Sequence, residues 1–122
     1  MKILVVDDEP LVRLTVRAVL EDCGATVLEA ANGVAALTLL EQDRDIDFLF
    51  TDIRMPGMNG VELAAAASAL RPDLAIALTT GYSEQAPGCY PLLRKPWLSD
   101  DLVRLLRQVQ AHRRPHGLAS CA

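Results

Sequence analysis

The sequence has no long hydrophobic run and no leader-like segment. No apolar stretch approaches the roughly 20 residues of a membrane-spanning helix. The apolar start of the chain, Met1–Val6, is too short for the core of a signal peptide, and two aspartates follow it at once. We therefore expect a cytoplasmic protein with no membrane partner.

The sequence is also poor in cysteine and in positive charge. Its three cysteines are far apart and odd in number, which fits neither a metal-binding pattern nor a set of disulfides. The net charge is −4 and basic residues gather only near the C-terminus, so no nucleic-acid partner is expected. With 122 residues, 51% of them hydrophobic, the chain is long and apolar enough for one folded domain.

Short apolar runs alternate with helical patterns along the chain. β-Branched runs such as Ile3–Val6 suit strands that are covered on both faces of a sheet. The patterns predict strands over 3–6, 25–30, 46–51, 74–79 and 91–94, and helices over 11–22, 33–41, 60–70 and after Ser99 as a cap. Such alternation predicts an α/β fold with a parallel, doubly wound sheet. A flavodoxin-like order of the five strands, 2-1-3-4-5, would place the first and third strands side by side.

One helix of this alternation is missing from the pattern. The segment between the fourth and fifth predicted strands contains Pro87-Gly88 and is too short for a helix with two connections. We predict that the fourth helix is absent or reduced to a loop. We assign residues 1–111 to the folded domain and residues 112–122 to a flexible C-terminal tail.

Acidic residues follow two of the predicted strands. Asp7 and Asp8 come after the first strand, and Asp52 comes after the third, just before a Pro-Gly turn. Converging carboxylates repel one another unless a cation lies among them, and oxygen ligands favour Mg²⁺. One carboxylate would then be free to act as a nucleophile, and we predict that Asp52 accepts a phosphoryl group. Thr80 and Lys95, at the ends of the next strands, would stabilise its charge.

Each of these residues has a simpler explanation when it is taken alone. Asp7 and Asp8 could be helix caps, and Asp52 could be an ordinary turn residue. Thr80 could be structural, and Lys95 could be a solvated surface charge. The functional interpretation depends on their combination at the ends of four strands.

Four motifs carry a resemblance to a known family. They are Val-Val-Asp-Asp-Glu-Pro over 5–10, Thr-Asp-Ile-Arg-Met-Pro-Gly-Met-Asn-Gly over 51–60, Thr80-Gly81, and Arg-Lys-Pro-Trp over 94–97. From Lys2 to about Val109 the sequence resembles a response-regulator receiver domain of two-component signalling. The resemblance implies that Asp52 is the phosphoacceptor. It also implies that the phosphodonor is a histidine kinase or a phosphotransferase.

The same resemblance implies roles for the surrounding residues. Asp8 and Asp52 would bind Mg²⁺ directly and Asp7 through water, while the backbone carbonyl of Arg54 would complete the protein ligands. The family pattern also places Thr80 and Lys95 on the phosphoryl oxygens. It further implies a cis peptide bond between Lys95 and Pro96, an isomer that proline makes accessible.

The sequence departs from the common family pattern in two respects. Leu92 stands where an aromatic switch residue is usual, three positions before the lysine, and the fourth helix is missing. The Thr80-Gly81-Tyr82 loop resembles that of a subgroup of stand-alone or kinase-linked receivers. We regard Arg54, Gly81 and Tyr82 as possible modulators, and we expect Arg54 to affect the lifetime of the phosphoryl group.

These observations predict a signalling module rather than an enzyme. It would signal by binding a partner or by relaying the phosphoryl group. The residues from Gln110 to Ala122 are too few for an output domain, so none is expected. One alternative is a phosphohydrolase with an aspartyl-phosphate intermediate, although Arg54 occupies the place of its usual general acid and cannot transfer protons at ordinary pH. Another is a docking module that is never phosphorylated.

Overall fold

A computed structural model of the chain describes residues 1–81, 88 and 90–112. Five strands and four helices lie within these residues. The strands are β1 (Lys2–Val6), β2 (Thr26–Ala30), β3 (Phe48–Asp52), β4 (Ala75–Thr80) and β5 (Leu92–Arg94). The helices are α1 (Pro10–Asp22), α2 (Gly33–Gln42), α3 (Gly60–Leu70) and α4 (Ser99–His112).

The strands form one parallel sheet in the order β2-β1-β3-β4-β5, which confirms the predicted fold class. In the register of β1 and β3, Val6 lies opposite Thr51. In the register of β3 and β4, Asp52 lies opposite Thr79. The carboxyl ends of these three strands therefore meet at one edge of the sheet, where parallel sheets commonly bind ligands.

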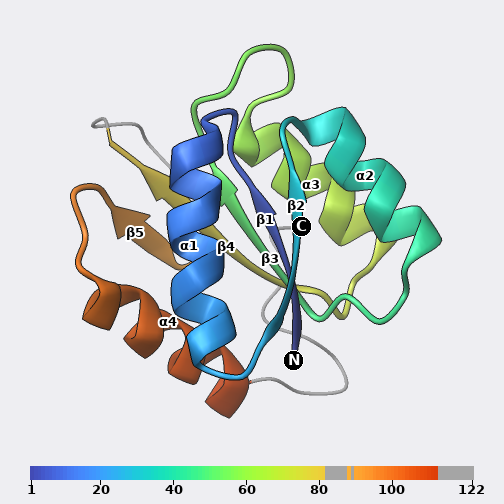
Figure 1. Cartoon of the computed structure of the whole chain (residues 1–122). Coiled ribbons are helices and arrows are strands. Elements are labelled where there is room, and N and C mark those ends of the chain that lie inside the picture. Colours follow the sequence, from blue (N-terminus) through green and yellow to red (C-terminus); the bar gives the residue numbers. More distant parts are fainter. Residues whose placement is uncertain (82–87, 89, 113–122) are drawn as a thin grey trace.

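Helices cover both faces of the sheet (Figure 1). α1 and α4 pack on one face around a core that includes Phe48, Phe50 and Leu102. α2 and α3 pack on the other face around Leu49, Leu63 and Leu78. Because both faces are covered, the central strands are continuous apolar runs, as the sequence pattern predicts.

Local sequence signals determine where the helices begin. Pro10 opens α1 with a backbone already suited to a first helical turn. The side chain of Asn59 accepts a hydrogen bond from the Glu62 N–H, and Glu62 accepts one from the Asn59 N–H, which makes a capping box at α3. The predicted Ser99 cap is wrong, because Ser99 is already the first residue of α4.

The predicted loss of the fourth helix falls on the β4–β5 connection. Most of this connection, residues 82–87 and 89, lies outside the described residues, as do residues 113–122 of the predicted tail. Within the part of the connection that the structure describes, no residue is helical. Among the described helices, none combines the length and the hydrophobicity that crossing a membrane requires.

Candidate functional site

Asp52 is the last residue of β3, and it is nearly buried, with 7% of its surface exposed. Its carboxylate accepts a hydrogen bond from the Arg54 N–H at 3.2 Å. The chain then turns sharply, and Gly57 has a φ of 75°, a backbone conformation that glycine adopts at little cost. The end of the strand and this hydrogen bond thus fix where the carboxylate lies, and one side of it faces a pocket.

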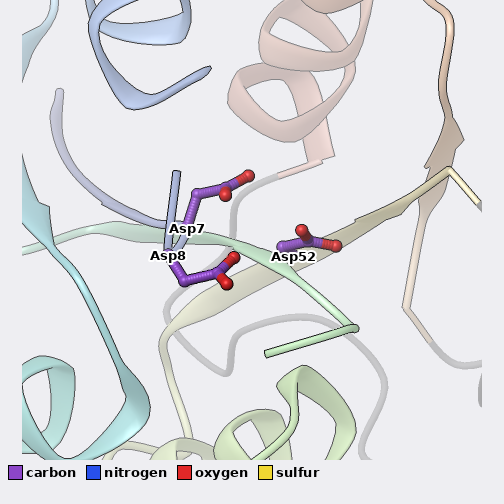
Figure 2. Close-up of side chains that lie close together, drawn as sticks. All are labelled: Asp7, Asp8 and Asp52. Carbon is purple, nitrogen blue, oxygen red and sulfur yellow. The ribbon is translucent and has the colours of Figure 1, made fainter. Parts of the chain in front are cut away.

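Asp7 and Asp8 follow β1, the strand that pairs with β3. Figure 2 shows their side chains extending from the end of β1 toward the space beside Asp52. Oxygen atoms from all three carboxylates lie within 4.8 Å of one another. Asp7 is buried, with 2% exposed, whereas Asp8 is exposed. The structure therefore brings the three predicted acidic residues together.

Lys95 brings the positive charge of this cluster from the far side of β4. Its Nζ lies 3.3 Å from Asp52 Oδ2 and 3.4 Å from Asp7 Oδ2. Its backbone N–H donates to the Thr80 carbonyl at 2.7 Å, which ties the end of β5 to β4. The side chain packs beside Gly81, and the Lys95–Pro96 peptide bond is cis.

Burial and charge shift the ionisation of two groups in the cluster. Burial raises the pKa of Asp7 above its usual value, and the charge of Asp52 adds to this effect. The Glu9 N–H and Lys95 oppose the rise without outweighing it. Burial alone would lower the pKa of Lys95, but the charges of Asp7 and Asp52 together outweigh it and raise that pKa. Lys95 is thus a cation near neutral pH, and one cation does not balance three carboxylates.

The acidic cluster fits a hard divalent cation. Its donors are carboxylate oxygens at close range, the ligands that Mg²⁺ prefers, and the residual negative charge favours a cation. One of the three carboxylates is solvent-exposed, which leaves room for the water ligands that Mg²⁺ usually keeps. Asp7, Asp8 and Asp52 would hold such an ion.

A pocket of about 670 Å³ opens over the cluster. Two of the three clustered aspartates, the lysine and the turn after β3 contribute to its lining. The lining residues are Asp8, Glu9, Val12, Asp52, Arg54, Met55, Pro56, Gly81 and Lys95. The carboxylate of Asp52 is therefore reachable by a small charged group, although most of the residue is buried.

The remaining predicted residues differ in whether they line this pocket. Arg54 is exposed and Gly81 lines the pocket wall. Thr80 has no exposed surface and is not among the lining residues. Tyr82 lies outside the described residues. The structure therefore places Arg54 and Gly81 at the open pocket, whereas Thr80 is buried and does not line it.

Two further residues at the site were not singled out from the sequence. Val12 lines the pocket, and Arg13 donates to the backbone carbonyl of Asp7 at 2.7 Å. Arg13 also pairs with Glu29 on β2 at 3.1 Å. Its partners are a strand residue and a backbone atom, so sequence spacing along a helix could not identify them.

Comparisons with known proteins identify the family of this chain. A family model described as "Response regulator receiver domain" matches residues 3–107. The chain therefore belongs to the response-regulator receiver domain family of two-component signalling. It is 36% identical over 114 residues to the response regulator receiver protein CpdR of Brucella abortus, and the match covers 88% of this chain and 93% of that protein.

Some relatives are much longer than this chain. It is 35% identical over 119 residues to the C4-dicarboxylate transport transcriptional regulatory protein DctD of Rhizobium meliloti, covering 92% of this chain but 26% of that protein. Among solved structures, the receiver domain of the hybrid histidine kinase CckA matches with a TM-score of 0.78 and 32% identity, covering 88% of this chain and 97% of that one. A CheY-like receiver protein from Methanospirillum hungatei matches with a TM-score of 0.84 and 26% identity, over 92% and 94% of the two chains.

Proposed function

We propose that this receiver domain accepts a phosphoryl group on Asp52 in a Mg²⁺-dependent reaction. The donor is the phosphohistidine of a histidine kinase or a phosphotransferase. The observation that carries the proposal is the position of Asp52, a carboxylate in an acidic pocket with Lys95 Nζ at 3.3 Å. The domain then passes the signal to a partner protein or along a phosphorelay.

The transfer exchanges one bond to phosphorus for another. The P–N bond of the phosphohistidine breaks, its electron pair returns to the imidazole, and a carboxylate oxygen of Asp52 forms a P–O bond. Such reactions depend mainly on positioning and on charge stabilisation. Bound Mg²⁺ would neutralise the carboxylates and draw a phosphoryl oxygen toward the site. Lys95 keeps a positive charge at the carboxylate that reacts.

Thr80 is proposed to bind a second phosphoryl oxygen. Thr80 is the last residue of β4, has no exposed surface and does not line the pocket, so we propose that it reaches the phosphoryl group through a local rearrangement at the end of β4. A phosphoryl group that binds Thr80 in the rearranged state would shift the domain toward that state. This population shift is our proposal for how phosphorylation changes the surface that a partner reads.

The test is the intact mass of the protein after incubation with small phosphodonors. Acetyl phosphate and phosphoramidate should each add one phosphoryl group in the presence of Mg²⁺. Asp52→Asn should stay unmodified, whereas Asp73→Asn, a matched change of an exposed carboxylate, should react like the wild type. Modification of Asp52→Asn would refute the assignment of the phosphoacceptor.

The same samples separate the two alternative functions. A phosphohydrolase would release phosphate continuously from ordinary phosphomonoesters, which the proposed acceptor does not. A docking module would give no adduct and no response to Mg²⁺. Titration with MgCl₂, followed by the fluorescence of Trp97, tests this second outcome because Trp97 is the sole tryptophan and lies two residues from Lys95.

A further inference from the structure

The turn between β1 and α1, residues 7–9, carries two of the proposed Mg²⁺ ligands. The carboxylate of Asp8 is exposed, and no hydrogen bond or ion pair holds it within the part of the chain that the structure describes. The backbone of the turn therefore sets the position from which this carboxylate reaches the ion. Whatever fixes that backbone also fixes the geometry offered to the ion.

Asp7 is the anchored residue of this turn. Its N–H donates to the Ala30 carbonyl at 3.3 Å, which extends the pairing of β1 with β2. Its carboxylate accepts from the Glu9 N–H at 2.9 Å, a contact within the turn. Its carbonyl accepts from Arg13 Nη1 at 2.7 Å. Among the described residues, Arg13 supplies the one side chain from outside the turn that holds its backbone.

The guanidinium of Arg13 is itself held in place. Its Nε donates to Glu29 Oε1 at 3.1 Å, and the other oxygen of Glu29 accepts from Arg17 Nη1 at 3.0 Å. Arg17 also pairs with Glu21 at 3.2 Å. The side chain of Arg13 is 17% exposed, so solvent screens its bonds less than those of a fully exposed pair. A planar, charged guanidinium group makes short and directional hydrogen bonds.

We propose that Arg13, oriented by Glu29, is a positioning residue that fixes the β1–α1 turn for Mg²⁺ binding. The inference rests on the proposed function, because it concerns the same acidic site. Arg13 does not contact the phosphoryl group or the ion in this role. It acts through the backbone of Asp7, and so through the direction of the Asp7 and Asp8 carboxylates.

Charge and positioning predict opposite effects of removing Arg13. A cation near the site repels Mg²⁺, so loss of its charge alone would tighten Mg²⁺ binding. Loss of a contact that orients metal ligands weakens binding, commonly by 10–100-fold, as is typical of outer-shell partners. Weaker binding in Arg13→Met therefore cannot be an effect of charge.

The experiment compares Mg²⁺ dissociation constants of the wild type with those of Arg13→Met, Arg13→Lys and Arg17→Met. Each constant is measured by titration with MgCl₂ alone, through Trp97 fluorescence and, independently, through the Mg²⁺-dependent rise of the urea midpoint. Arg17→Met is the matched control, because it removes an equal charge and a bond to Glu29 but leaves the contact with Asp7. Arg13→Lys keeps the charge but lacks the planar guanidinium group that bonds Glu29 and the Asp7 carbonyl at the same time.

We expect Mg²⁺ to bind about tenfold more weakly to Arg13→Met and Arg13→Lys, and within about twofold of wild type to Arg17→Met. A destabilising effect on the fold appears in the urea midpoint without Mg²⁺ and is thereby separated from the change in affinity. Wild-type or tighter binding by Arg13→Met would overturn the inference alone, as would equal weakening by Arg17→Met. A wild-type protein that does not bind Mg²⁺ would overturn the proposed function, and this inference with it.

Discussion

Gly60 is the residue at which the packing of α3 meets the backbone of the proposed phosphoacceptor. A Cβ added to Gly60 would lie 2.1 Å from the carbonyl oxygen of Asp52 and 2.7 Å from the Cα of Ile53. These are backbone atoms of the sheet edge, so no side-chain rotation relieves the clash. The Gly60 N–H also donates to the Ile53 carbonyl at 2.8 Å, and this bond depends on the same close approach. The change Gly60→Ala should therefore push the start of α3 away from β3.

The cost of Gly60→Ala can be worked out from these contacts. Overpacking that moves the backbone costs roughly 1–3 kcal/mol. Weakening the hydrogen bond of the Gly60 N–H adds about 1 kcal/mol. The smaller conformational freedom of alanine in the unfolded chain offsets about 0.4–1 kcal/mol. We expect the free energy of unfolding to fall by about 2 kcal/mol.

Gly33 provides a matched control at the start of α2. Both glycines are the first residue of a helix after an asparagine cap, and neither has a positive φ. The nearest atom to a Cβ at Gly33 is Met58 Sδ at 2.7 Å, which belongs to a flexible side chain. Gly33→Ala should change the free energy of unfolding by less than about 1 kcal/mol, because Sδ and Cγ of Met58 can move with a rotamer change and a small shift relieves the contact with its Cβ at 3.1 Å.

Urea unfolding at equilibrium, followed by circular dichroism, measures both variants. The reasoning requires a clear difference between them, with Gly60→Ala the less stable protein. It is refuted if Gly60→Ala is as stable as the wild type, or if Gly33→Ala loses as much stability. A changed dependence on urea would indicate that the unfolded or folded state differs, and the midpoints would then not be compared.

Three further predictions address the helix cap, the ion-pair network and the charge of the site. Asn59→Ala should cost about 1 kcal/mol of unfolding free energy and about as much as Asn32→Ala, because each change removes one side-chain acceptor of a helix N–H while the backbone N–H of residue 59 can still donate to Glu62; an unchanged urea midpoint in Asn59→Ala would contradict this. Hydrogen bonds from Arg17 and then from Arg13 hold the pKa of Glu29 below its usual value. Ionised Glu29 therefore stabilises the fold at pH values above its unfolded pKa, and this stabilisation is lost as the pH falls through the folded pKa. Glu29→Gln should thus lower the urea midpoint at about pH 7 and leave it almost unchanged at about pH 2.5, and an equal effect at both would argue against this linkage. Lys95→Met should bind Mg²⁺ about threefold more tightly in a titration, since it removes a repelling cation, yet accept phosphoryl groups more slowly; weaker Mg²⁺ binding would show that Lys95 orders the carboxylates instead.

The strand order could be predicted because the chain alternates strands and helices, and right-handed crossovers leave few arrangements for such a chain. The exact ends of the strands and helices were harder to predict from the sequence. The predicted strands over 46–51 and 74–79 lie at 48–52 and 75–80, because the pairing partners decide which residues join the sheet. Ser99 was expected to cap α4, yet the Leu98 N–H, one residue earlier, donates to Asp101 at 2.8 Å. That bond depends on how the chain enters the helix, which composition does not specify.

At the acidic site, the sequence likewise predicts some of the residues that matter and not others. Asp7, Asp8 and Asp52 were predictable because each lies at or just after the end of a strand, and topology alone brings the ends of neighbouring parallel strands together. The contact between Arg13 and the Asp7 carbonyl was not, because a backbone oxygen leaves no trace in the sequence. Residues that supply the chemistry are therefore visible from their type and position, whereas residues that orient them become visible only when the helix is docked on the sheet.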